Sequence, residues 1–446
     1  MNDLTKGKPS QVMLRFAFPI ALGNIFQLFY SLADTRVVGS TLGMDSLAAV
    51  GATTSISTLF IGFLSGLTNG FAILVAREYG AGHKDGVRRL SAGSLTLGIV
   101  TALVLTGVCV AFLPLLLGIL NVSEELMPEA VSYIRVILLG LVVTLAYNGC
   151  AGILRAVGDT TAALVFLICA SFLNIALDLM FILVFHMGVG GAAFATVVSQ
   201  SVSAIASFIY MQKRYEIFRF RMSDFRVNRE DARSLYTSGL SMATMMSLVF
   251  FGTLALQCAI NTFGNDTIVA HTAARKVTEF FMLPFTVMSA TMATYCGQNM
   301  GAGKLDRIRT GIWQALVMTW VWSAGMIVLS YTAAPQLIHM VTGTDRQQVL
   351  RTGAQYLKFD TLFYFAPAAI CVLRNALQGL GEHRIPVWSS FIELAGKVLI
   401  AFFLTPVLQY WGIIVAEPIV WILMVIPLIV QIRRLLWSDH AGSTGA

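Results

Sequence analysis

Twelve apolar stretches, each long enough to cross a bilayer as a helix, follow one another along this sequence. A membrane-spanning helix needs about 20 mostly apolar residues. With 57% of its residues apolar and 12% charged, the chain is unlike a soluble multidomain enzyme or a disordered protein. We therefore expect an all-α polytopic membrane protein whose twelve transmembrane helices cover residues 15–36, 46–74, 90–117, 129–153, 161–185, 191–211, 235–262, 271–295, 311–334, 352–377, 386–407 and 412–432.

Basic residues indicate which way the chain is oriented. The N-terminus, every second loop and the C-terminus hold 21 of the 30 Lys and Arg residues, whereas the opposite loops hold three. Because cytoplasmic loops retain basic residues, both termini are predicted to be cytoplasmic. No signal-peptide pattern occurs at the N-terminus. The net charge of +7 then needs only a basic membrane face, so we expect no nucleic-acid partner.

The two halves of the chain resemble each other. Residues 41–50 and 262–271 align at an offset of 221, as do residues 80–85 and 301–306, and Gly191 with Gly412. Residues 154–159 and 377–382 align at 223. Six spans per repeat make the repeats parallel, as in transporters that rock one bundle against the other. We predict an N-lobe (1–212), a basic cytoplasmic linker (213–234), a C-lobe (235–433) and a C-terminal tail (434–446).

A group of polar side chains is predicted inside the first lobe. Gln27, Tyr30 and Asp34 share one helix face, and Asn174 and Asp178 share another. Ionisable residues at membrane depth are costly and mark functional sites. Thr196, Tyr133 and Asn148 add further oxygen-bearing side chains.

Two carboxylates in one pocket could share a proton, and the same oxygens suit a hard cation such as Na⁺. We therefore predict a cation-coupling site at Asp34, Asn174, Asp178 and Thr196. Tyr133 and Asn148 are assigned to the same site. A structural hydrogen-bond network between helices is the alternative. No cofactor and no catalytic residue is expected.

The second half lacks this site, because Ala255 stands opposite Asp34. Glu279 could attract a cationic solute or pair with Arg275, and it joins Gln27 and Tyr30 as a candidate for the substrate cleft. Glu393 and Lys397 are spaced for an ion pair. Glu417 stands opposite Thr196, and Asp360 is predicted near the outer end of the tenth span.

Pro19 interrupts the first span. A proline removes a helical hydrogen bond and permits a bend. The bend could be a conformational hinge or a static kink.

The sequence resembles the multidrug and toxic compound extrusion (MATE) family, in its DinF-like branch. The matching motifs extend over most of the chain: Pro19-Ile, Gln27-Leu-Phe-Tyr-Ser-Leu-Ala-Asp34-Thr, Val38-Gly39, Leu47-Ala-Ala-Val-Gly51, Tyr79-Gly-Ala-Gly82, Leu154-Arg-Ala-Val-Gly-Asp-Thr160, Gly297-Gln-Asn-Met-Gly-Ala-Gly303 and Gly379-Leu-Gly381. In this branch the positions of Asp34, Asn174, Asp178 and Thr196 form the N-lobe cation site.

The resemblance implies a secondary transporter of the cell membrane, not an enzyme. It implies that organic, often cationic and lipophilic compounds leave in exchange for inward H⁺ or Na⁺, and that ion binding at Asp34 reshapes the first helix around Pro19. The lipid bilayer and small organic cations are the expected partners, and the protein is expected to be a monomer. The alternative is a flippase of a lipid-linked oligosaccharide or peptidoglycan precursor. An enzyme is disfavoured because no H-E-x-x-H, G-x-S-x-G or Walker lysine motif occurs.

Overall fold

Helices make up nearly all of the described chain. The computed structural model describes residues 3–119 and 123–437, among which there is no β-strand. These residues form two compact units. Unit 1 holds Phe18–Ala243 together with Asp3, and unit 2 holds Leu4–Ala17 and the chain from Thr244 onward. Residues 438–446 of the predicted tail (434–446) lie outside the described residues. Residues 1–2 of the predicted N-lobe also lie outside them.

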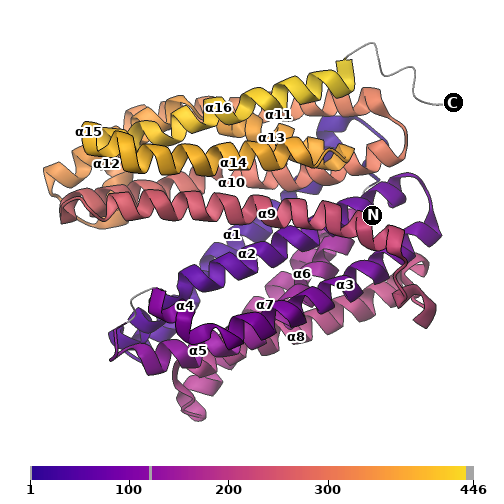
Figure 1. The fold of residues 1–446 in the computed structure, drawn as a ribbon, viewed down its shortest axis with the longest axis horizontal. Coiled ribbons are helices and arrows are strands. Elements are labelled where there is room, and N and C mark those ends of the chain that lie inside the picture. Colours follow the sequence, from indigo (N-terminus) through magenta and orange to yellow (C-terminus); the bar gives the residue numbers. More distant parts are fainter. Residues whose placement is uncertain (1–2, 120–122, 438–446) are drawn as a thin grey trace. The chain divides into compact units, whose positions relative to one another are not determined.

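Unit 1 is a bundle of long helices, with two short 3-10 turns between α8 and α9. Its elements are α1 (Pro9–Thr41, from Phe18), α2 (Met44–Gly80), α3 (Lys84–Ala111), α4 (Leu113–Ile119), α5 (Met127–Leu139), α6 (Leu141–Ala156), α7 (Thr160–Leu179), η1 (Met180–Val184), α8 (Gly188–Arg214), η2 (Glu216–Phe218), η3 (Met222–Phe225) and the first part of α9 (Arg229–Ile260). Figure 1 labels these helices.

Unit 2 is built from the rest of α9 and the helices after it. They are α10 (Asn265–Gly301), α11 (Leu305–Thr342), α12 (Gln347–Leu362), α13 (Phe365–Leu380), α14 (Arg384–Leu399), η4 (Ile400–Leu404), α15 (Thr405–Leu408) and α16 (Tyr410–Trp437). Leu4–Ala17, which includes the first turns of α1, also belongs to this unit.

The predicted spans are confirmed as helices. Ten helices among the described residues are long and apolar enough to cross a membrane, and two bent pairs bring the number to twelve. The bent pairs are α5 with α6, at 46°, and α12 with α13, at 52°. The predicted third span (90–117) is divided between two helices, because α3 ends at Ala111 and α4 begins at Leu113.

The internal repeat is visible in the backbone. The two bends lie at Gly140 and Phe363, which are 223 residues apart. π-Helical turns, η1 and η4, end the seventh and the fourteenth helix. Gly82 and Gly303, both at positive φ, stand 221 residues apart. Gly82 lies in the turn between α2 and α3, and Gly303 lies in the turn between α10 and α11. A glycine at these two turns avoids the steric cost that a side chain meets at positive φ.

Equivalent hydrogen bonds also recur in the two units. Asp159 caps α7, accepting from the Ala162 N–H at 3.1 Å, and accepts a second hydrogen bond from the Tyr210 hydroxyl at 3.1 Å. Glu382 accepts from the backbone N–H of Arg384 at 2.8 Å and from the Gln431 amide at 3.1 Å. Tyr210 and Gln431 are separated by the repeat offset of 221.

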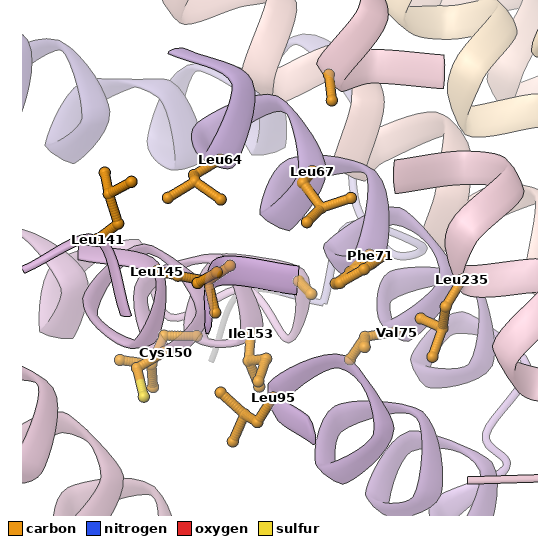
Figure 2. Packing of buried hydrophobic residues seen from close by; sticks show 14 of the residues in the cluster. Leu64, Leu67, Phe71, Val75, Leu95, Leu141, Leu145, Cys150, Ile153 and Leu235 are labelled. Atoms are coloured by element: carbon orange, nitrogen blue, oxygen red, sulfur yellow. The ribbon is translucent and has the colours of Figure 1, made fainter. Parts of the chain in front are cut away.

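The apolar core of unit 1 lies between α2, α3 and α6 (Figure 2). Leu64, Leu67 and Phe71 lie one turn apart along α2, and each is at most 2% exposed. Leu145 and Ile153 of α6 belong to the same cluster. Helices packed in this way hold the neighbouring polar side chains of α7 and α8 in fixed positions.

Candidate functional site

Five of the predicted site residues lie together in unit 1. Asn174 and Asp178 stand one turn apart on α7 and are 1% and 0% exposed. With its amide oxygen turned toward Thr196 of α8, Asn174 accepts from the Thr196 N–H at 3.0 Å. Its amide nitrogen then donates to Asp178 Oδ2 at 3.0 Å and to the Tyr30 hydroxyl oxygen at 3.1 Å. This orientation satisfies both ends of the Asn174 amide, whereas the opposite one would place the amide oxygen against the Asp178 carboxylate. Asp34 completes the group.

The two aspartates of the cluster are in direct contact. The side chains of Asp34 on α1 and Asp178 lie close enough to interact directly. A carboxylate has no hydrogen to donate, so a hydrogen bond between the two side chains would use one shared proton. The Oδ1 atom of each residue is buried and has no hydrogen-bond partner. Within the described residues no Lys, Arg or His forms an ion pair with either aspartate.

Tyr133 and Asn148, the other two residues predicted for this site, differ in their contacts with the cluster. Tyr133, half-buried on α5, lies within electrostatic range of Asp34 and Asp178. Asn148 is half-buried on α6. In the described part of the chain, no hydrogen bond joins Asn148 to the cluster.

The substrate-cleft candidates lie in different surroundings. Tyr30 belongs to the cluster, whereas Gln27 is exposed on α1. Glu279 is exposed on α10 and forms an ion pair with Lys276 at 3.3 Å. The alternative prediction of a Glu279–Arg275 pair is wrong, because the Arg275 Nη1 atom lies 2.6 Å from Glu417 Oε2.

A second polar cluster lies inside unit 2. Glu417 of α16 accepts from Arg275 and, at 3.2 Å, from the Tyr356 hydroxyl. The Lys397 ammonium lies 2.9 Å from Glu393 Oε1 and 3.5 Å from Glu417 Oε1. The predicted Glu393–Lys397 ion pair is therefore confirmed. Each of these two glutamates has a resident cationic partner.

Asp360 belongs to the same region of unit 2. It is 0% exposed, and neither carboxylate oxygen accepts a hydrogen bond from a described residue. The prediction that it lies near the outer end of its span is wrong, because it precedes the α12/α13 bend at mid-span. His271, Arg275, Tyr356 and Glu417 also line a small cavity of about 30 Å³.

Sequence reasoning named most of these acids and bases singly and missed the second cluster. One signal could have found it. Tyr133 and Tyr356 each stand seven residues before the bend of their spans, and they are 223 residues apart. Thr196 and Glu417 are separated by 221. The second cluster therefore occupies repeat positions of the first.

The fold and the first cluster define a class: a polytopic membrane protein of two repeated bundles with a buried carboxylate pair in one of them. The MatE family model matches residues 19–180 and again residues 241–403, once in each half. The chain belongs to the MatE family.

Relatives and solved structures agree with this assignment. The chain is 26% identical over 390 residues to "Probable multidrug resistance protein YpnP" of Bacillus subtilis, covering 85% of this chain and 84% of the relative. It is 24% identical to "Probable multidrug resistance protein NorM" of Thermotoga maritima, covering 89% and 86%. A crystal structure of a MATE protein in the bent conformation superposes with a TM-score of 0.87 at 24% identity, covering 97% of both chains.

Proposed function

We propose that this protein is a secondary active antiporter. It exports organic, cationic and lipophilic compounds in exchange for inward H⁺ or Na⁺, by alternating access, with both termini in the cytoplasm. Membership in the MatE family and the multidrug resistance names of its relatives support the substrate class. The observation that carries the coupling mechanism is the Asp34–Asp178 contact, with no resident cation beside it among the described residues.

The carboxylate pair supplies a reason for ion coupling. Asp34 and Asp178 can stay in contact only while a proton or a cation lies between them, because two bare carboxylates at hydrogen-bond distance repel. Asn174 and Thr196 offer amide and hydroxyl oxygens, which also suit Na⁺. Ion binding therefore favours the state in which α1 packs on α7, and ion release favours a different one.

Pro19 gives α1 a place to bend. It has no N–H to donate to the carbonyl of Arg15, one turn earlier. The chain passes from unit 2 to unit 1 between Ala17 and Phe18, and Phe18 directly precedes this proline. A bend at Pro19 would move Tyr30 and Asp34 relative to α7 without breaking the rest of the helix.

Coupling then requires the drug and the ion to prefer different states. Tyr30 contacts Asn174 of the cluster and stands on the same face of α1 as the exposed Gln27. This face could therefore sense both the ion and the drug. Glu279, held by Lys276, would require that ion pair to open before attracting a cationic solute.

Reconstitution into lipid vesicles tests the proposal. A fluorescent lipophilic cation is loaded, and a proton gradient and a sodium gradient are imposed in separate experiments. We expect transport under one gradient at least, which also identifies the coupling ion. Transport under neither gradient would overturn the antiporter assignment and would favour a flippase of a lipid-linked precursor.

A further inference from the structure

A long apolar groove lies in unit 2 between α11, α13 and α16. Its volume is about 810 Å³, within the range of about 300–1,000 Å³ that is typical of small-molecule sites. Trp313, Leu316 and Trp320 of α11 form one wall, and Leu373 of α13 and Ile432 of α16 face them. Nothing in the described chain covers Trp313, which is 60% exposed.

The equivalent groove of unit 1 is filled by the chain itself. Leu95 and Met211, the repeat counterparts of Leu316 and Ile432, belong to one apolar cluster with Phe218 of η2. Phe218 is 0% exposed. The Phe220 ring stacks on Phe208 with centroids 5.6 Å apart. The linker after α8 thus covers this groove with aromatic side chains.

In unit 2 no described residue takes the place of these aromatic side chains. Phe208 corresponds to Ile429, which lines the open groove. The repeat therefore contains one groove that is filled by protein and one with an apolar wall left exposed.

One end of the open groove is basic. Arg433 and Arg434 line it in the last turns of α16, and both are exposed. The Arg309 Nε atom donates to the Leu436 carbonyl at 2.6 Å, which joins the start of α11 to this end of α16. The groove thus runs from a pair of guanidinium groups past Trp313 toward Trp320, which is seven residues, about 10 Å, further along α11.

We propose that this groove binds an anionic phospholipid. An acyl chain fits the apolar wall between Trp313 and Trp320, and the phosphate of the headgroup lies against Arg433 and Arg434. Basic pockets between membrane helices bind anionic headgroups, and tryptophans favour the level of the headgroups. In unit 1 the linker takes the place of the acyl chain.

Native mass spectrometry of the full chain in detergent tests this site. The protein is titrated with phosphatidylglycerol and, separately, with phosphatidylcholine. The double variant Arg433→Gln/Arg434→Gln should bind phosphatidylglycerol about 25-fold more weakly, since each basic residue near an anionic lipid contributes about fivefold. Its binding of phosphatidylcholine should be unchanged.

A matched control removes two basic charges at the same end of the repeat counterpart, where Lys213 is the equivalent of Arg434 and Arg214 follows it. Lys213→Gln/Arg214→Gln at the end of α8 alters the groove that the linker fills, and phosphatidylglycerol binding should stay within twofold of the unaltered protein. Equal losses in the two double variants would overturn the proposal, because the effect would then be general surface charge. Dimers of this chain that compete with lipid would also overturn it.

A groove-filling variant tests the acyl chain independently of the headgroup. Ala369, a small residue lining the groove on α13, is replaced by Phe. We expect Ala369→Phe to weaken the binding of both phospholipids to a similar extent. Thermal unfolding checks that the variant is folded. If the variant binds phosphatidylglycerol as the unaltered protein does, the acyl chain does not lie in this groove.

Discussion

The two units carry polar clusters at equivalent positions of the repeat, yet the clusters have opposite electrostatic character. In unit 1 the position of Thr196 carries a hydroxyl, and in unit 2 the equivalent Glu417 carries a charge. Asp34 has Ala255 as its counterpart. The first cluster joins two carboxylates with amides and hydroxyls, whereas the second joins glutamates with Arg275 and Lys397.

This difference separates a cluster that needs an external cation from one that contains its own. Glu417 has its cationic partners built into α10 and α14. Asp34 and Asp178 have none among the described residues, and in the proposed antiport mechanism a proton or metal cation from solution takes that place. A duplicated scaffold can thus place ion exchange in one lobe and a permanent ion-pair network in the other.

The largest expected effect comes from removing the charge of the first cluster. In Asp34→Asn, the side chain stays polar and similar in shape but can no longer exchange a proton. We expect gradient-driven export in vesicles to fall to background, with insertion and folding intact. The exposed Asp306 provides the control, because Asp306→Asn makes the same chemical change outside the cluster. Export that survives Asp34→Asn would refute ion coupling at this residue.

Substitutions in the second cluster should lower the free energy of unfolding. Arg275→Gln leaves Glu417 buried with only Lys397 and Tyr356 as partners. Breaking a buried ion pair costs about 3–5 kcal/mol, and the remaining partners place this case near the lower end. Chemical unfolding in detergent measures the change.

The double variant Arg275→Leu/Glu417→Leu sharpens this prediction. Removing both charges leaves no uncompensated ion, so most of the lost stability should return. If the double variant is as unstable as Arg275→Gln, the arginine contributes through packing and the ion pair is not the stabilising contact.

The sequence predicted the fold well, because a bilayer imposes a simple length rule on apolar stretches. The breaks inside spans were harder to predict. Gly140 offers a reason for the bend between α5 and α6, and Pro367 offers one for the equivalent bend at Phe363, because it has no N–H to donate to the Phe363 carbonyl. A single glycine or proline does not by itself predict where a span breaks, since Pro19 and Pro284 lie inside unbroken helices.

The site was predictable only in part. Asn174 and Asp178 could be placed together because one turn separates them on a single helix. The Glu417–Arg275 pair joins residues 142 positions apart, and helix spacing favoured the wrong partner, Glu279. Contacts across a bundle depend on helix rotation, which polar residues alone do not define.

A smaller effect is expected when the first cluster loses one hydrogen-bond partner. Thr196→Ala removes the hydroxyl that lies 3.3 Å from the Asn174 amide. Such a contact contributes about 1 kcal/mol, so the apparent affinity for the coupling ion should fall about fivefold. Ion titration of transport in vesicles measures it. Thr196→Ser keeps the hydroxyl and should stay close to the unaltered protein; equal losses in both variants would exclude the hydroxyl as the cause.

The smallest effect is expected at the equivalent loop contacts of the two units. Asp159 Oδ2 accepts from Tyr210 at 3.1 Å and also from Tyr215 at 2.5 Å, whereas Glu382 Oε2 accepts from Gln431 at 3.1 Å. Burial and the Asp159 carboxylate raise the pKa of Tyr215, so its hydroxyl keeps its proton and continues to donate when Tyr210 is altered.

Tyr210→Phe should therefore lower the free energy of unfolding by about 0.5 kcal/mol, and Gln431→Leu by about 1 kcal/mol. Thermal unfolding of both variants in the same detergent provides the comparison. A larger loss in Tyr210→Phe than in Gln431→Leu would mean that Tyr215 does not compensate for Tyr210. In that case each of the two equivalent loops would be stabilised by a single donor. Tyr215 would then stabilise the linker and not the loop.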